Sequence, residues 1–285
     1  DAGVAYAERM GAGGIEALRA IPASQLIAQT AKAGFVPFGI IDDVYLTAQM
    51  PDVFDRGEQA KVPVLAGFNE GEIRSLRFLL PPLPAKASDY DAAIRAGYGD
   101  LAELFLQLYP SSSLEASMLA TTRDAMYGWT AERLAAAQDA LGYPSYFYLF
   151  DHSYPNADRL GLRAFHAAEI PYMFGNLDAA VSPWPEPPRT RQERALSDAM
   201  MQYWASFARD GKPTAEGAPN WPRYGDGATG MVFNETPAAF PGLARERFEL
   251  QEEVVCRRRA AGTLQWNWNV GIIAPPLPAP DPACG

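Results

Sequence analysis

The chain has 285 residues, of which 48% are hydrophobic and 20% charged, a balance typical of a globular protein that buries a core. Its formal net charge of −10 argues against a nucleic-acid partner, because phosphate binding needs a basic surface. No apolar stretch reaches the ~20 residues that a bilayer span requires, so we expect no membrane span.

The start of the chain is rich in alanine and favours short helices. Residues 15–29 have the apolar spacing of two helices that meet at Pro22, a residue that can begin a helix but not continue its middle. The N-terminus lacks both an initiator Met and the basic and apolar regions of a signal peptide. We therefore expect the chain to begin inside a domain, with more protein upstream.

Three segments have the composition of strands. Residues 61–69 form a near-continuous apolar run closed by Gly and Asn, which predicts a strand buried on both faces of a parallel sheet. Residues 146–150 form a second run of this kind, and residues 231–234 a short third one.

Helices are predicted between these strands and after them. Residues 101–109 and 122–141 fit helical periods, and residues 192–209 fit best. This third helix is expected to end at Asp210-Gly211. Strands that alternate with helices predict an α/β layered sheet. The apolar stripe of the third helix, which we interpret as core packing, consists of Ala195, Leu196, Ala199, Met200, Tyr203, Trp204, Phe207 and Ala208.

The C-terminal region offers fewer signals. Residues 257–259 are three consecutive arginines, interpreted here as solvated surface, and residues 270–285 form a Pro-rich tail expected to be irregular. Cys256 and Cys284 form either a disulfide, which would suggest an oxidising compartment, or two free thiols. Their spacing, with only two histidines in the chain, argues against a structural zinc site.

The two histidines limit the search for a general base. His152 sits between Asp151 and Ser153, but neighbouring residues on a strand point to opposite faces, so we interpret it as a strand end running into a polar turn. His166 follows a turn-rich loop after the second predicted strand, and sites in open α/β sheets form beyond the carboxyl ends of strands. Glu72, just after the first strand, could orient an imidazole.

Two longer segments resemble a known family. GFNEGE at residues 67–72 resembles the G-x-N-x-x-E motif of the type-B carboxylesterases, the cholinesterase-like branch of the α/β hydrolases. FHAAEIPYMFG at residues 165–175 is similar to their H-x-x-E-(I/L)-x-(Y/F)-x-F-G segment. The resemblance implies that Glu72 is the acid and His166 the base of a catalytic triad, in the usual chain order. Glu169 matches a further acidic position, as a buried supporting group or as a helix N-terminal carboxylate.

The resemblance covers essentially the whole chain, yet the family's G-x-S-x-G turn and Gly-rich oxyanion loop do not occur in it. It implies an α/β chain with the C-terminal half of an α/β-hydrolase fold: an incomplete, mostly parallel sheet with flanking helices. Residues 1–285 would be the C-terminal part of a single catalytic domain, including the irregular tail at 270–285. The serine and the oxyanion hole would lie in a missing N-terminal half. Alone, the chain is expected to be inactive and poorly soluble, with an exposed sheet edge.

The implied function is carboxylic-ester hydrolysis by a Ser-His-Glu triad through an acyl-enzyme, without metal or organic cofactor. The expected partners are a small-molecule ester and the missing N-terminal half, and a secreted or periplasmic location is favoured. The main alternative is a non-catalytic, cholinesterase-like adhesion or binding module. A complete binding or structural protein that shares only local strings, or another α/β hydrolase such as a lipase or lactonase, also remains open. The presence of both Glu72 and His166 favours an enzyme.

Overall fold

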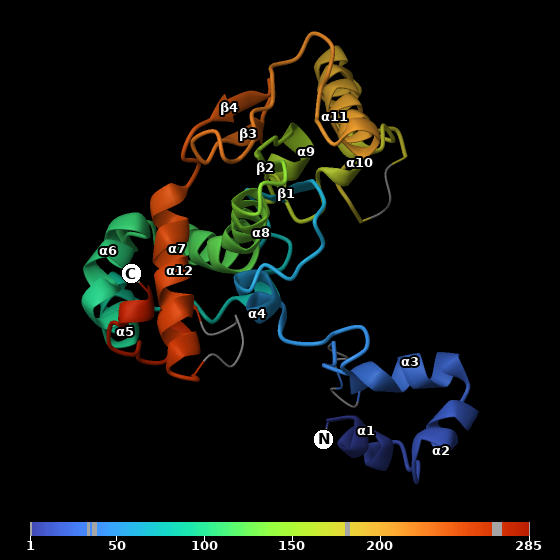
Figure 1. Ribbon diagram of the computed structural model, residues 1–285, viewed down its shortest axis with the longest axis vertical. Coiled ribbons are helices and arrows are strands. Elements are labelled where there is room, and N and C mark those ends of the chain that lie inside the picture. The colour runs from blue at the N-terminus through green and yellow to red at the C-terminus, as the bar shows by residue number, and fades with distance from the viewer. Residues whose placement is uncertain (1, 33–34, 36–38, 180–182, 264–269, 285) are drawn as a thin grey trace. The chain divides into compact units, whose positions relative to one another are not determined.

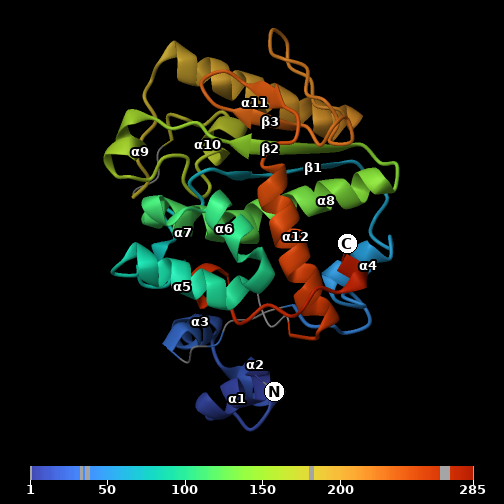
Figure 2. The same ribbon diagram turned by 90° about the vertical axis from the view of Figure 1, so that its left-hand side faces the viewer.

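Within the described part of residues 59–285, four strands form a central sheet (Figures 1 and 2). Strand order follows chain order, with the first three strands parallel and the fourth antiparallel to the third. The carboxyl ends of the parallel strands therefore meet at one edge of the sheet, where a site can form. The strands are β1 (Val64–Asn69), β2 (Ser145–Phe150), β3 (Gly230–Phe233) and β4 (Ala238–Phe240).

Apolar side chains project from both faces of β1 and β2, as expected for strands buried in a parallel sheet. On one face Phe68 and Phe147 pack with Phe248 of helix α12 (Arg245–Ala260). On the other face Tyr146 and Tyr148 join a larger aromatic cluster. The two predicted strands are confirmed, although β1 begins three residues later than expected because Pro63 has no backbone N–H to donate to the ladder.

Gly67 lies opposite Tyr148 in the β1–β2 pairing. A Cβ atom at position 67 would lie 2.3 Å from Cδ1 of Tyr148, closer than any real contact. The glycine is required by this close approach, which keeps β1 tight against β2 up to the end that carries the predicted acid.

Helices cover both faces of the sheet (Figure 2). On the Phe68 face lie α8 (Trp129–Ala140) and α12 (Arg245–Ala260). On the other face lie α10 (Ile170–Met173) and α11 (Arg191–Asp210). This layered arrangement confirms the predicted α/β architecture.

Helix α11 confirms the strongest helical prediction. Its N-cap Thr190 accepts a hydrogen bond from the backbone N–H of Glu193, and Gly211 ends it in the left-handed conformation at φ 69°. Leu196, Met200 and Tyr203 of the predicted stripe are buried against the sheet.

A further helical layer packs against α12 and the C-terminal tail. The layer contains α5 (Ala87–Tyr98), α6 (Ala102–Leu108) and α7 (Leu114–Arg123).

Among the described residues, no helix is long and apolar enough to cross a membrane. Short elements of residues 59–285 are η1 (Arg77–Leu79), η2 (Gly99–Leu101), η3 (Ser111–Ser113), the π-helical turn η4 (Asp124–Gly128), α9 (Pro155–Arg159), η5 (Gly271–Ile273) and η6 (Pro282–Cys284).

Residues 1–58 form a separate unit. It contains α1 (Ala2–Arg9), α2 (Ile15–Ala20), α3 (Ala23–Lys32) and α4 (Met50–Asp55), with the α2–α3 break at Pro22 as predicted. The assignment of both units to one catalytic domain stays a prediction. The structure, a computed structural model, describes residues 2–32, 35, 39–179, 183–263 and 270–284.

The interpretation of residues 257–259 as solvated surface is wrong for two of the three arginines. Arg257 and Arg258 are each 4% exposed on α12. The Arg257 guanidinium donates to both carboxylate oxygens of Asp100 at 2.8 and 3.0 Å and to Glu253 at 2.6 Å. These side chains are covered because α12 packs between the helical layer and the tail, a long-range contact that the local charge pattern does not reveal.

Two further expectations are corrected. The sheet has a fourth strand, β4, which was not predicted because Ala238-Ala239-Phe240 is short and has little strand preference. The single helix expected at 122–141 is instead the end of α7, the π-helical turn η4 and the helix α8.

The C-terminal tail is fastened to the helical layer. The backbone N–H of Gly271 donates to the Tyr98 hydroxyl at 2.8 Å, and that of Leu277 donates to the carbonyl of Gly97 at 3.0 Å. Cys256 and Cys284 form a disulfide, which decides between the two alternatives left open by the sequence. Apart from the turns η5 and η6, the described part of the tail is irregular, as predicted.

We expect reduction of this disulfide to lower the free energy of unfolding by about 3 kcal/mol, because the unfolded chain regains the freedom of a loop closed across 28 residues. Denaturant unfolding with and without dithiothreitol measures the difference. The double variant Cys256→Ser/Cys284→Ser serves as control and should not respond to the reductant. Identical curves for the parent protein under both conditions would contradict the bond.

Candidate active site

The two segments predicted to carry the site lie side by side at the carboxyl end of β1. Gly71 forms a parallel bridge with Phe165, and its N–H donates to the carbonyl of Ala164 at 2.8 Å. A Cβ atom at Gly71 would lie 2.6 Å from the Leu162 carbonyl oxygen, so a larger residue would push the segments apart. The bridge brings together two residues that are 94 positions apart, Glu72 and His166.

The imidazole of His166 is bonded to the carboxylate of Glu72, with 2.5 Å between Nδ1 and Oε2. Glu72 is 5% exposed, whereas the His166 side chain is 46% exposed. The hydrogen bond to Glu72 raises the pKa of His166 above its ordinary value, assisted by the negative charges of Glu72 and Glu169 and opposed by partial burial. When Nδ1 carries the proton that is donated to Glu72, Nε2 of the neutral ring is a proton acceptor.

The Glu72 carboxylate has a second anchor. Its Oε1 accepts a hydrogen bond from the backbone N–H of Asn69 at 2.8 Å, while Oε2 is bonded to His166. Each oxygen of this buried carboxylate therefore has a partner, which fixes its orientation toward the imidazole.

Asn69, the middle residue of the G-x-N-x-x-E motif, joins the two segments a second time. It is 1% exposed, and its Nδ2 donates to the carbonyl of Phe165 at 2.8 Å and to the Glu169 carboxylate at 2.5 Å. Burial raises the pKa of Glu169, and the hydrogen bond from Asn69 opposes that rise. Asn69 was not singled out from the sequence, although its place in the motif was a signal.

Glu169 combines features of both roles weighed for it. It is the N-cap residue of the four-residue helix α10, without a side-chain cap hydrogen bond, and it is partly buried behind the His166 segment. Its bonded partner is Asn69 rather than His166, so it supports the turn that presents the imidazole.

The backbone turns sharply beside His166. Ala167 adopts φ 70° and Arg163 φ 52°, in the left-handed region that non-glycine residues seldom occupy. Strained residues of this kind persist where surrounding structure holds them, and they cluster at functional sites.

His152 lies in the core rather than in this site. It is 3% exposed, and its Nε2 is 2.8 Å from the Glu193 carboxylate, which also accepts from the Tyr172 hydroxyl at 2.5 Å. The predicted site residues Glu72, His166 and Glu169 are thus brought together, and His152 is bonded elsewhere.

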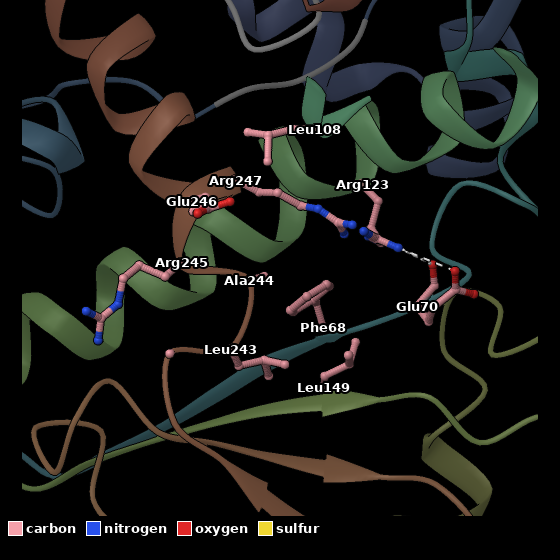
Figure 3. A pocket seen from close by; sticks show the side chains of 11 residues that line it. Phe68, Glu70, Leu108, Arg123, Leu149, Leu243, Ala244, Arg245, Glu246 and Arg247 are labelled. Carbon is pink, nitrogen blue, oxygen red and sulfur yellow. Dashed lines mark hydrogen bonds and ion pairs between the residues drawn. The ribbon is translucent and has the colours of Figure 1, made fainter. Parts of the chain in front are cut away.

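An open cavity of about 690 Å³ lies beside the same strand end (Figure 3). Phe68 and Leu149 line its sheet side, and Arg123 reaches across to Glu70. The Arg123 guanidinium donates to the backbone carbonyl of Glu70 at 3.3 Å and to its side chain at 3.4 Å. Helix α7 is thereby tied to the turn that carries Glu72. Among the described residues, no group of three or more His, Cys, Asp or Glu side chains could hold a metal ion.

The chain is similar to known esterases: the model of the Carboxylesterase family matches residues 4–248. Cocaine esterase of Homo sapiens is 26% identical over 76% of the chain, and Fumonisin B1 esterase of Sphingopyxis macrogoltabida is 30% identical over 73% of it. Para-nitrobenzyl esterase of Bacillus subtilis (strain 168) is 31% identical over 65% of the chain.

Solved structures give the fold. A thermophilic PNB esterase superimposes with a TM-score of 0.65 at 24% identity, covering 88% of this chain, and another PNB esterase structure gives 0.64 over 82%. This likeness confirms the predicted α/β-hydrolase fold class. The chain spans 53% and 49% of those two structures, and 41%, 39% and 36% of the cocaine, fumonisin B1 and para-nitrobenzyl esterases.

Glu72→Gln is expected to lower the pKa of His166, because the variant removes the charge that favours imidazolium. A raised folded-state pKa stabilises the fold while the ring is protonated, and this contribution is lost as pH rises through that pKa. NMR titration of the imidazole protons measures the midpoint, and the signal that disappears in His166→Ala is assigned to this ring. Equal midpoints in the parent and in Glu72→Gln would contradict the pairing.

Asn69→Ala is expected to cost about 1–3 kcal/mol of stability, because the buried carbonyl of Phe165 and the partly buried carboxylate of Glu169 lose their donor. Asn156→Ala is the matched control, since Asn156 also donates to a backbone carbonyl, that of Glu186, but at an exposed position. Denaturant unfolding compares the two variants, and equal losses would show that Asn69 does not hold the segments together.

Proposed function

We propose that this chain, which belongs to the carboxylesterase family, supplies the acid and the histidine of a Ser-His-Glu triad that hydrolyses carboxylic esters. The observation that carries the proposal is the hydrogen bond between His166 Nδ1 and the buried Glu72 carboxylate at the carboxyl end of β1. A carboxylate in this position holds the imidazole in the tautomer whose Nε2 accepts a proton and stabilises the imidazolium that forms.

The proposed reaction uses His166 twice. As a serine oxygen bonds to the ester carbonyl carbon, its proton passes to Nε2 of His166. The imidazolium then gives that proton to the oxygen of the leaving alcohol, as the bond between this oxygen and the carbonyl carbon breaks. Water then attacks the acyl-enzyme and gives a proton to Nε2 as its oxygen bonds to the acyl carbon. The imidazolium returns that proton to the serine oxygen as the acid is released. Glu72 stays in place throughout and stabilises the charged ring.

The serine is proposed to lie outside this chain, in an N-terminal half of the same protein. The 285 residues contain no G-x-S-x-G turn, and the chain covers about half of the matched structures. Among the described strands, β1 pairs only with β2 and is therefore an edge strand. Its unpaired N–H and C=O groups would be satisfied by a strand of the missing half. We infer that the chain alone is inactive and poorly soluble.

The relatives indicate the chemical class of the substrate but differ in the compounds they are named for: cocaine, fumonisin B1 and para-nitrobenzyl esters. The proposed substrate class is therefore a small-molecule carboxylic ester. The disulfide between Cys256 and Cys284 supports a secreted or periplasmic location, because such bonds persist in oxidising compartments. A cholinesterase-like binding module is the second candidate, and the bonded pair of Glu72 and His166 favours the enzyme over it.

The test uses the full-length protein that contains this chain and a short-chain p-nitrophenyl ester. His166→Ala should lower kcat/KM by about 10³-fold or more, and Glu72→Ala by a comparable factor, because a triad acts as a unit. Glu216→Gln, which alters an exposed carboxylate outside the candidate site, is the control and should retain most of the activity.

Full activity in His166→Ala, or no activity in the parent protein, would contradict the proposal and favour the binding module. The chain expressed alone should show no turnover.

A further inference from the structure

The π-helical turn η4 separates α7 from α8 at the edge of the candidate site. Turns of this kind are rare within helical segments and occur frequently at functional sites. The sequence predicted one continuous helix here, so the turn is a departure from local preference. Its fourth residue, Tyr127, contacts the imidazole of His166.

The start of η4 is anchored by a buried ion pair. Asp124 is fully buried and accepts hydrogen bonds from the Tyr109 hydroxyl at 2.9 Å and from Nε of Arg123 at 2.7 Å. Arg123 in turn binds the backbone carbonyl of Glu70, two residues before Glu72 (Figure 3). The turn is thus tied to the segment that carries the predicted acid.

The end of η4 is anchored by close packing. A Cβ atom at Gly128 would lie 2.7 Å from Cε1 of Phe248 and 3.2 Å from Cζ of Phe68. A glycine is needed for η4 to approach the sheet this closely. With both ends held, the position of Tyr127 between them is defined by the core and not by a mobile loop.

The Tyr127 ring lies 5.5 Å from the His166 ring, centroid to centroid, with 55° between their planes. Tyr127 is half-buried, and its ring packs against the cluster of Phe68, Phe147 and Phe248. Burial raises the pKa of the Tyr127 phenol, and the negative charge of Glu72 adds to the effect, so the ring remains neutral.

His166 needs such a contact. Its described side-chain hydrogen bond is at Nδ1, which holds one corner of the ring, and nearly half of the side chain is exposed. With the covalent bond at Cγ and the hydrogen bond at Nδ1, the plane of the ring can still tilt about the line through these two atoms. An aromatic ring within ~6 Å also attracts a cation, which favours the imidazolium.

We propose that Tyr127 is a positioning residue that restrains the His166 imidazole by ring contact and stabilises its protonated form. This inference rests on the proposed function, in which His166 is the general base. Glu72 then fixes the Nδ1 end of the ring and Tyr127 restrains its plane, while η4 supplies the rigidity. The contribution comes from the aromatic ring and not from the phenolic hydroxyl.

The test compares Tyr127→Leu and Tyr127→Phe in the full-length protein, with Met126→Ala as a control for disturbance of the same turn. Tyr127→Leu should lower kcat about 10-fold with little change in KM, as expected for the loss of a cation–aromatic contact. The acidic limb of its kcat/KM profile, which reports His166 in the free enzyme, should move to lower pH. Tyr127→Phe should restore both values, and Met126→Ala should leave them unchanged.

Equal losses in Tyr127→Phe and Tyr127→Leu would overturn the proposal, because the hydroxyl would then be responsible. A raised KM in Tyr127→Leu, with no shift in the acidic limb of its kcat/KM profile, would also overturn it, because the ring would then line the substrate pocket. If the parent protein shows no esterase activity, the proposed function fails, and the NMR midpoint of His166 decides the inference separately. A lower midpoint in Tyr127→Leu supports the ring contact, and an equal midpoint overturns it.

Discussion

The parallel bridge between Gly71 and Phe165 is the constraint on which the candidate site depends. It brings a turn at the end of β1 against a loop that follows β2, although the two are far apart in sequence. Only a glycine fits at position 71, because any side chain would collide with the backbone of the facing loop. With the bridge formed, Glu72 and His166 come within hydrogen-bond distance, and Asn69 joins the same two segments a second time.

The sheet and its two aromatic clusters keep this bridge in place. Gly67 allows β1 to lie tightly against β2, and the rings of β2 pack against α11 on one face and α12 on the other. On the α12 face the same packing positions η4, so one core supports both the acid–histidine pair and the ring of Tyr127. Among the described strands, β1 is at the edge of the sheet, and Glu72 follows it by three residues. The acid–histidine pair therefore lies near this edge.

Elements with strong local signals were predicted well from the sequence. The strands β1 and β2 are continuous apolar runs, and helix α11 has an apolar stripe and capping residues at both ends. The buried arginines of α12, the strand β4 and the turn η4 depend on contacts between distant segments, which no local pattern reports. In the site, the motifs identified Glu72, His166 and Glu169. The contacts that Asn69 and Tyr127 make with them could not be predicted from the sequence, because packing between distant segments positions the Asn69 amide and the Tyr127 ring.

We propose that Glu72 and His166 activate a serine located outside this chain. The most direct test of this proposal is to treat the full-length protein with a fluorophosphonate probe, which bonds to activated serines, and to locate the label by peptide mass spectrometry. We expect one labelled serine, outside residues 1–285, and a labelling rate that falls sharply in His166→Ala. A label on a serine within this chain, or an equal rate in His166→Ala, would contradict it.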